Sequence, residues 1–137
     1  MDEPPFVDDI TVLDSAELWR RIIPDWVVPD DNRGCKRVSS AAFSDSPDGS
    51  PLSMLLAETV FSTGRTAQDV LSRFPECSLA ALQAGDVRAQ RQVVSHTPIV
   101  EDEPAHVFVA GSKTRAVRRA LARAARWVIG PGNGREA

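Results

Sequence analysis

The sequence predicts an α+β fold with a small mixed or mostly antiparallel sheet, short helices and a C-terminal amphipathic helix. Residues 105–110 alternate like a strand and lead through Gly111 into a helical pattern, and other short apolar runs have the length of strands. These runs do not alternate strictly with helices, as a parallel βαβ fold would require. We expect a single domain over residues 11–130, with a flexible acidic tail at 1–10 and another tail at 131–137.

Residues 15–22 admit two interpretations. Asp14 has the character of a helix N-cap, and Glu17 three residues later completes a capping box, which favours a short helix. The apolar residues of the same segment also fit a strand over residues 18–23. We expect the helix.

Strand and turn patterns follow in the middle of the chain. Residues 30–34 are typical of an exposed turn, and the small residues of 36–44 favour a strand. A Pro- and Gly-containing loop over 46–51 then leads to residues 52–58. That apolar segment fits either a strand or a helix capped near Ser50.

The next segments are shorter. Thr66 begins a helix that runs to Phe74 and ends at Pro75, because proline disfavours helical continuation. Residues 79–82 form a short apolar run, and Asp86 is a candidate cap for one more helical turn. Val93 and Val94 favour a strand.

The last element is predicted to be a helix from residue 115 to residue 129. Ser112 or Thr114 would cap it, and Gly130 and the proline after it would end it. An apolar stripe recurs at helical spacing through Val117, Leu121, Ala124 and Val128. The run 111–114 resembles part of a phosphate-binding loop but lacks the glycine five residues earlier, so a plain turn with a helix cap is expected.

Charge is distributed unevenly along the chain. Residues 1–31 carry nine acids and two arginines, whereas residues 113–137 carry seven bases and one acid, in a chain of net charge −3. No apolar run approaches the roughly 20 residues that cross a bilayer, and the acidic N-terminus is unlike a secretory signal. We therefore expect a cytoplasmic protein. Cys35 and Cys77 belong to no close ligand pair, so we expect neither a metal nor a resident cofactor.

The basic terminal helix is the main candidate for a binding surface. Its cations are Lys113, Arg115, Arg118, Arg119, Arg123 and Arg126. Arginine forks bind carboxylates and phosphates, so this surface predicts an anionic partner. The pI near 5.3 and the absence of tyrosine fit an acidic protein partner, or self-association, better than nucleic acid.

Two enzymatic alternatives remain open. Arg20 or Arg21, then Ser39 or Ser40, then Glu58 is the order found in ADP-ribosyltransferase-like folds, in which these residues act on NAD. A ribonuclease-like site would instead use His106 as a general base. Its further candidates are His96, Arg88, Lys113 and Ser40. Each of these residues also fits an ordinary solvated or structural role.

Four segments together resemble a family of small bacterial hypothetical proteins, over roughly residues 17–129. They are residues 19–22, 37–43, 52–54 and 105–114. The resemblance implies a bacterial cytoplasmic origin and no particular activity. The sequence therefore predicts a small accessory or regulatory binding module that engages an acidic protein through a basic helix face, with a small enzyme as the alternative.

Overall fold

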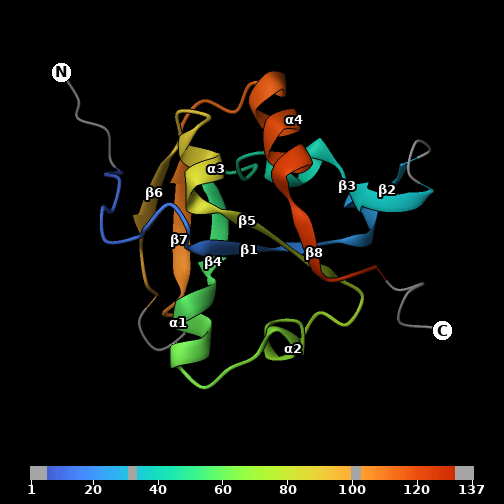
Figure 1. Ribbon diagram of the computed structural model, residues 1–137, viewed down its shortest axis with the longest axis horizontal. Helices are drawn as coiled ribbons and strands as arrows, with labels where there is room; N and C mark the ends of the chain where they lie inside the picture. Colours follow the sequence, from blue (N-terminus) through green and yellow to red (C-terminus); the bar gives the residue numbers. More distant parts are fainter. Residues whose placement is uncertain (1–5, 31–33, 100–102, 132–137) are drawn as a thin grey trace.

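The α+β prediction is confirmed by a computed structural model that describes residues 6–30, 34–99 and 103–131. Six strands form an antiparallel sheet in the order β6-β7-β4-β1-β5-β8, and β2 and β3 form a separate hairpin (Figure 1). The strands are β1 Glu17–Ile22, β2 Val27–Asp30, β3 Cys35–Val38, β4 Leu52–Leu56, β5 Ser78–Gln83, β6 Val93–His96, β7 His106–Ala110 and β8 Arg126–Ile129. The helices are α1 Ala57–Ser62, α2 Ala67–Val70, α3 Ala84–Arg88 and α4 Arg115–Ala124, with 3-10 turns η1 Pro24–Trp26 and η2 Ser40–Phe43.

The helix expected over residues 15–22 is wrong, because Glu17–Ile22 form β1, a central strand. It pairs with β5 along its whole length and with β4 on its other side. The two residues that suggested a capping box have other partners. Glu17 accepts a hydrogen bond from the Trp19 indole at 2.6 Å, and Asp14 pairs with Arg88 at 2.8 Å. Burial of β1 between two strands outweighs the local capping preference.

The terminal helix is confirmed but is shorter than predicted. Thr114 caps α4 by accepting from the Val117 amide, and α4 ends at Ala124 instead of residue 129. Residues 126–129 form β8, which pairs with the free edge of β5. The strand satisfies backbone groups of β5 that a longer helix would have left without partners.

The remaining elements confirm most of the predicted patterns. The strand expected over 36–44 ends at Val38 and continues as η2, and residues 52–58 contain β4 followed by the start of α1. The capping box of α2 joins Thr66 and Asp69, although α2 covers only residues 67–70. The apolar run 79–82 lies in β5, and the strand at 93–94 is part of β6.

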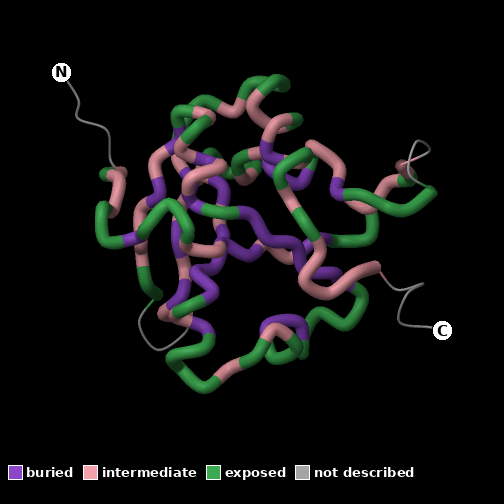
Figure 2. The backbone as a smooth tube through the Cα atoms, in the orientation of Figure 1, coloured by how far each residue is buried: buried purple, intermediate pink, exposed green. Residues whose placement is uncertain are grey.

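The sheet is covered on both faces (Figures 1 and 2). One face packs with α3, α4 and η2, where Phe43 and Leu121 are fully buried. The other face is partly covered by α1 and α2 around Trp19 and Val60, and Figure 2 shows the central strands as buried. The middle of the expected turn at 30–34 and the outer parts of both expected tails, at residues 31–33, 1–5 and 132–137, lie outside the described residues. No helix in the described ranges is long and apolar enough to span a membrane.

Candidate functional site

Helix α4 lies beside the β2–β3 hairpin (Figure 1). The two elements form a groove of about 1020 Å³. Six cationic side chains line it, and we call it the basic groove: Lys36, Arg37, Arg115, Arg119, Arg123 and Arg126. They come from β3, α4 and β8, three segments that are separate in the sequence. Asp30 is the one acidic residue among the described residues that line this groove.

The spacing of apolar and basic residues on α4 explains the groove. Leu121 is fully buried against the sheet, so the side chains on the far side of the helix turn outward. Arg115, Arg119 and Arg123 follow one another every four residues and form a row along that side. The hairpin is held against the end of β8 by the Trp127 indole, which donates to the Lys36 carbonyl oxygen at 3.1 Å.

Most of these charges have no counter-ion among the residues that the structure describes. Arg126 pairs with Glu17 of β1. The side chains of Arg115, Arg119 and Arg123 make no ion pair or hydrogen bond with any described residue, and the same is true of Arg37. Like charges one helical turn apart repel by about 0.2–0.5 kcal/mol per pair. An anion in the basic groove would relieve this repulsion.

Two of the predicted binding residues lie elsewhere. The Lys113 side chain is only 6% exposed, and its ammonium pairs with Asp45 at 2.9 Å. It also donates to the Val109 and Gly111 carbonyl oxygens, at 2.8 and 3.1 Å. Arg118 donates through Nε to the Lys113 carbonyl oxygen. Both side chains therefore stabilise the turn between β7 and α4, and neither lines the basic groove.

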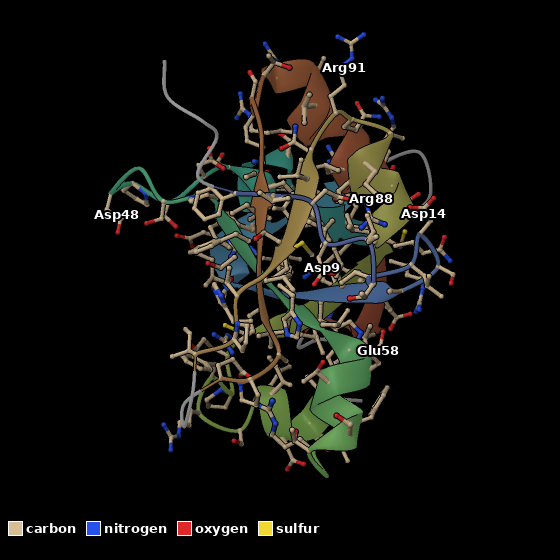
Figure 3. The ribbon with its side chains drawn as sticks, turned by 90° about the vertical axis from the view of Figure 1, so that its left-hand side faces the viewer. Asp9, Asp14, Asp48, Glu58, Arg88 and Arg91 are labelled. Carbon is tan, nitrogen blue, oxygen red and sulfur yellow. The ribbon has the colours of Figure 1, made fainter. Side chains whose placement is uncertain are left out.

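The structure does not bring the ADP-ribosyltransferase-like candidates together. Arg20 donates to the carbonyl oxygens of Ala42 and Ser53, whereas Ser40 lines the basic groove. Glu58 is exposed at the start of α1 (Figure 3) and does not line the basic groove. The alternatives Arg21 and Ser39 are also apart, because Ser39 lines the basic groove and Arg21 lines a groove on the other sheet face.

The ribonuclease-like candidates are also dispersed. Arg88 pairs with Asp8 and Asp14 and donates to the Asp9 carbonyl oxygen (Figure 3), which attaches residues 8–14 to α3. His96 bonds the Pro104 carbonyl oxygen. The serine beside His106 is Ser53 and not the candidate Ser40, since Nε2 of His106 lies 3.1 Å from the Ser53 hydroxyl.

Sequence reasoning missed three residues that bear on these grooves. Lys36 and Arg37 were interpreted only as part of a strand, and a basic pair beside a turn was the available signal. Ser53 is a lone hydroxyl in an apolar strand, which was also visible in the sequence. No sequence pattern indicated which distant segments these three residues would contact in the folded chain.

The described residues contain no cluster of three or more His, Cys, Asp or Glu side chains suited to a metal ion. Comparison with models of protein families finds no match to the chain. Neither the curated proteins nor the solved structures include a significant match.

Proposed function

We propose that the protein is a small accessory or regulatory binding module whose basic groove engages an acidic segment of a partner protein. The observation that carries this proposal is the convergence of six cationic side chains on one groove with one acidic neighbour in the described part of the chain. A bacterial origin and a cytoplasmic location belong to the same proposal and rest on the sequence resemblance.

The row of arginines suits an extended segment. Four helical residues advance about 6 Å, so Arg115, Arg119 and Arg123 present their charges at about that interval. An extended chain advances about 6.6 Å per two residues. Carboxylates at alternate positions of such a segment would therefore face successive arginines, and each guanidinium can bind a carboxylate through two N–H groups.

An acidic protein fits this groove better than a nucleic acid. The whole chain carries a net charge of −3, so a long polyanion would meet repulsion outside the groove. Nucleic-acid sites also present aromatic rings for stacking. Trp127 lines the basic groove, but it is partly buried and its indole N–H is already bonded to the hairpin.

The test uses two labelled peptides of equal composition, one with glutamates alternating with serines and one with the glutamates in a single block. Fluorescence anisotropy should show tighter binding of the alternating peptide to the full chain. Replacing Arg115, Arg119 and Arg123 together with glutamine should weaken that binding at least about tenfold, since each exposed pair contributes up to about 1 kcal/mol. Binding should also weaken with added salt, because such contacts are screened.

Arg91→Gln is the matched control, because Arg91 is exposed but lies outside the basic groove. It should bind the alternating peptide as the wild type does. Equal binding of both peptides, equal loss in control and triple variant, or displacement of the peptide by a single-stranded oligonucleotide of the same charge would contradict the proposal. So would a salt-sensitive dimer that the triple variant abolishes, because the occupant would then be a second copy.

A further inference from the structure

A second groove, of about 830 Å³, lies on the other face of the sheet from the basic groove. Its floor is formed by β1, β4 and β7, and one wall by the residues around α2. Four arginines line it, and we call it the arginine groove: Arg20, Arg21, Arg65 and Arg73. Its volume lies within the range of about 300–1,000 Å³ that small-ligand sites occupy.

The acidic side chains of this groove are already engaged. Both oxygens of Glu103 accept from Arg65, at 3.0 and 2.6 Å. Asp69 accepts from the Thr66 amide and hydroxyl in the capping box of α2. No carboxylate of the described residues forms an ion pair with Arg20, Arg21 or Arg73. The lining therefore has four arginines against two carboxylates, and the pKa of Glu103 is lowered by the hydrogen bonds from Arg65, with a smaller contribution from the charge of Arg21.

Two of these arginines are held in place before any ligand arrives. Arg20 donates through Nε and Nη1 to the carbonyl oxygens of Ala42 and Ser53, and its guanidinium lies 5.1 Å from the Trp26 ring centre. The Arg21 guanidinium lies 4.5 Å from the Phe74 ring centre. Contact with a ring occupies the face of a guanidinium, so the edge N–H groups of Arg21, and those of Arg20 that do not bond the two carbonyl oxygens, remain available for an anion.

The charge on Arg20 is poorly compensated. Its burial and the neighbouring charge of Arg21 lower the pKa of Arg20 to about 10. It therefore stays protonated at neutral pH, but its charged form is less stable there than in water. An anion beside it would reverse this effect, because an opposite charge favours the protonated form.

Ser53 lies between Arg20 and His106. The Ser53 carbonyl oxygen accepts from Nη1 of Arg20 at 3.0 Å, and the Ser53 hydroxyl lies 3.1 Å from Nε2 of His106. Nδ1 of His106 lies 3.0 Å from the carbonyl oxygen and 2.9 Å from the hydroxyl of Thr97, in the loop after β6. These contacts help to hold the part of β4 to which Arg20 is bonded.

We propose that the arginine groove binds a small phosphate-bearing ligand, whose phosphate is held chiefly by Arg21, with Arg20 and Arg73 as further cations of the lining. A phosphate dianion has the charge and the number of acceptor oxygens to engage more than one arginine, whereas a carboxylate has one charge and two oxygens. The arginine groove is separate from the basic groove, so this proposal does not depend on the function proposed above.

Titration calorimetry with inorganic phosphate, pyrophosphate and AMP tests the proposal on the full chain. Pyrophosphate should bind more tightly than phosphate, and Arg21→Gln should weaken it about tenfold or more, as expected for charge-assisted hydrogen bonds. Arg21→Lys should recover part of the loss, because it restores the charge without the fork. The two sources of phosphate are distinguished by AMP: tighter binding than phosphate indicates a nucleotide-like ligand, and equal binding indicates inorganic anions.

Arg91→Gln is the matched control, because Arg91 is exposed and lines neither groove, and it should bind pyrophosphate as the wild type does. Thermal unfolding followed by circular dichroism verifies that each variant is folded. The proposal is overturned if no heat is observed with millimolar pyrophosphate. It is also overturned if Arg21→Gln, while folded, binds as tightly as the control, because the anion would then occupy another surface.

Discussion

Alanine substitutions of Lys113 and Arg119, compared with each other, test which basic residues stabilise the fold and which bind a partner. Both were predicted from the sequence to contact a partner, but Lys113 is 6% exposed and Arg119 is exposed. We expect Lys113→Ala to lower the free energy of unfolding strongly and Arg119→Ala to lower it little. Binding of the alternating acidic peptide should respond in the opposite order.

The magnitude for Lys113 follows from its contacts. The ammonium pairs with Asp45 at 2.9 Å and donates to two carbonyl oxygens. Breaking a fully buried pair costs about 3–5 kcal/mol, and because the Asp45 side chain is 39% exposed we expect about 2–3 kcal/mol for Lys113→Ala. Arg119→Ala should stay within about 0.5 kcal/mol, as for a surface change.

Urea unfolding followed by circular dichroism measures the two costs, and peptide anisotropy measures binding. Lys113→Met serves as a second variant, since it keeps most of the apolar stem and removes only the charge. Its loss should approach that of Lys113→Ala, because the ion pair and hydrogen bonds dominate. The reasoning is refuted if Lys113→Ala costs no more than Arg119→Ala, or if folded Lys113→Met loses peptide binding while Arg119→Ala retains it.

Two further predictions concern stability. Leu121→Asp should unfold or severely destabilise the protein because it buries an unpaired charge at a site that is 0% exposed, whereas Arg119→Asp should be tolerated within about 0.5 kcal/mol; equal costs in chemical denaturation would show that the faces of α4 are misassigned. Hydrogen bonds from Arg65 lower the pKa of Glu103, so its contribution to stability is fully present above the ordinary carboxyl pKa of 4.5 and is lost as the pH falls through the lowered value. The stability difference between wild type and Glu103→Gln should therefore shrink on acidification, and a difference that stays constant from pH 7 to pH 3 would contradict this assignment.

Local patterns were sufficient where an element is specified by its own residues. The alternation of Val107 and Val109 predicted β7, and Thr114 predicted the start of α4, because a strand face and a helix cap depend on residues a few positions apart. The Thr66 cap of α2 was correct for the same reason. The arginine row on α4 also followed from helical spacing.

Tertiary contacts determined the secondary structure of segments whose local preferences for helix and strand were balanced. Residues 17–22 carry both a capping signal and strand-forming residues, and burial between β4 and β5 selected the strand. Residues 126–129 continue a helical pattern, yet the open edge of β5 offered backbone partners that a helix would have left unsatisfied. Neither choice is visible in a window of neighbouring residues.

Tertiary structure also determined which residues line each groove. By itself, the sequence determined that a basic amphipathic helix follows Thr114 and that the charges are unevenly distributed along the chain. Packing determined which charges are free: Lys113 is enclosed beside Asp45, whereas Arg37 of the distant hairpin faces the same groove as Arg119. A charge is available for binding only if folding brings no counter-charge to it, and that depends on residues far away in the chain.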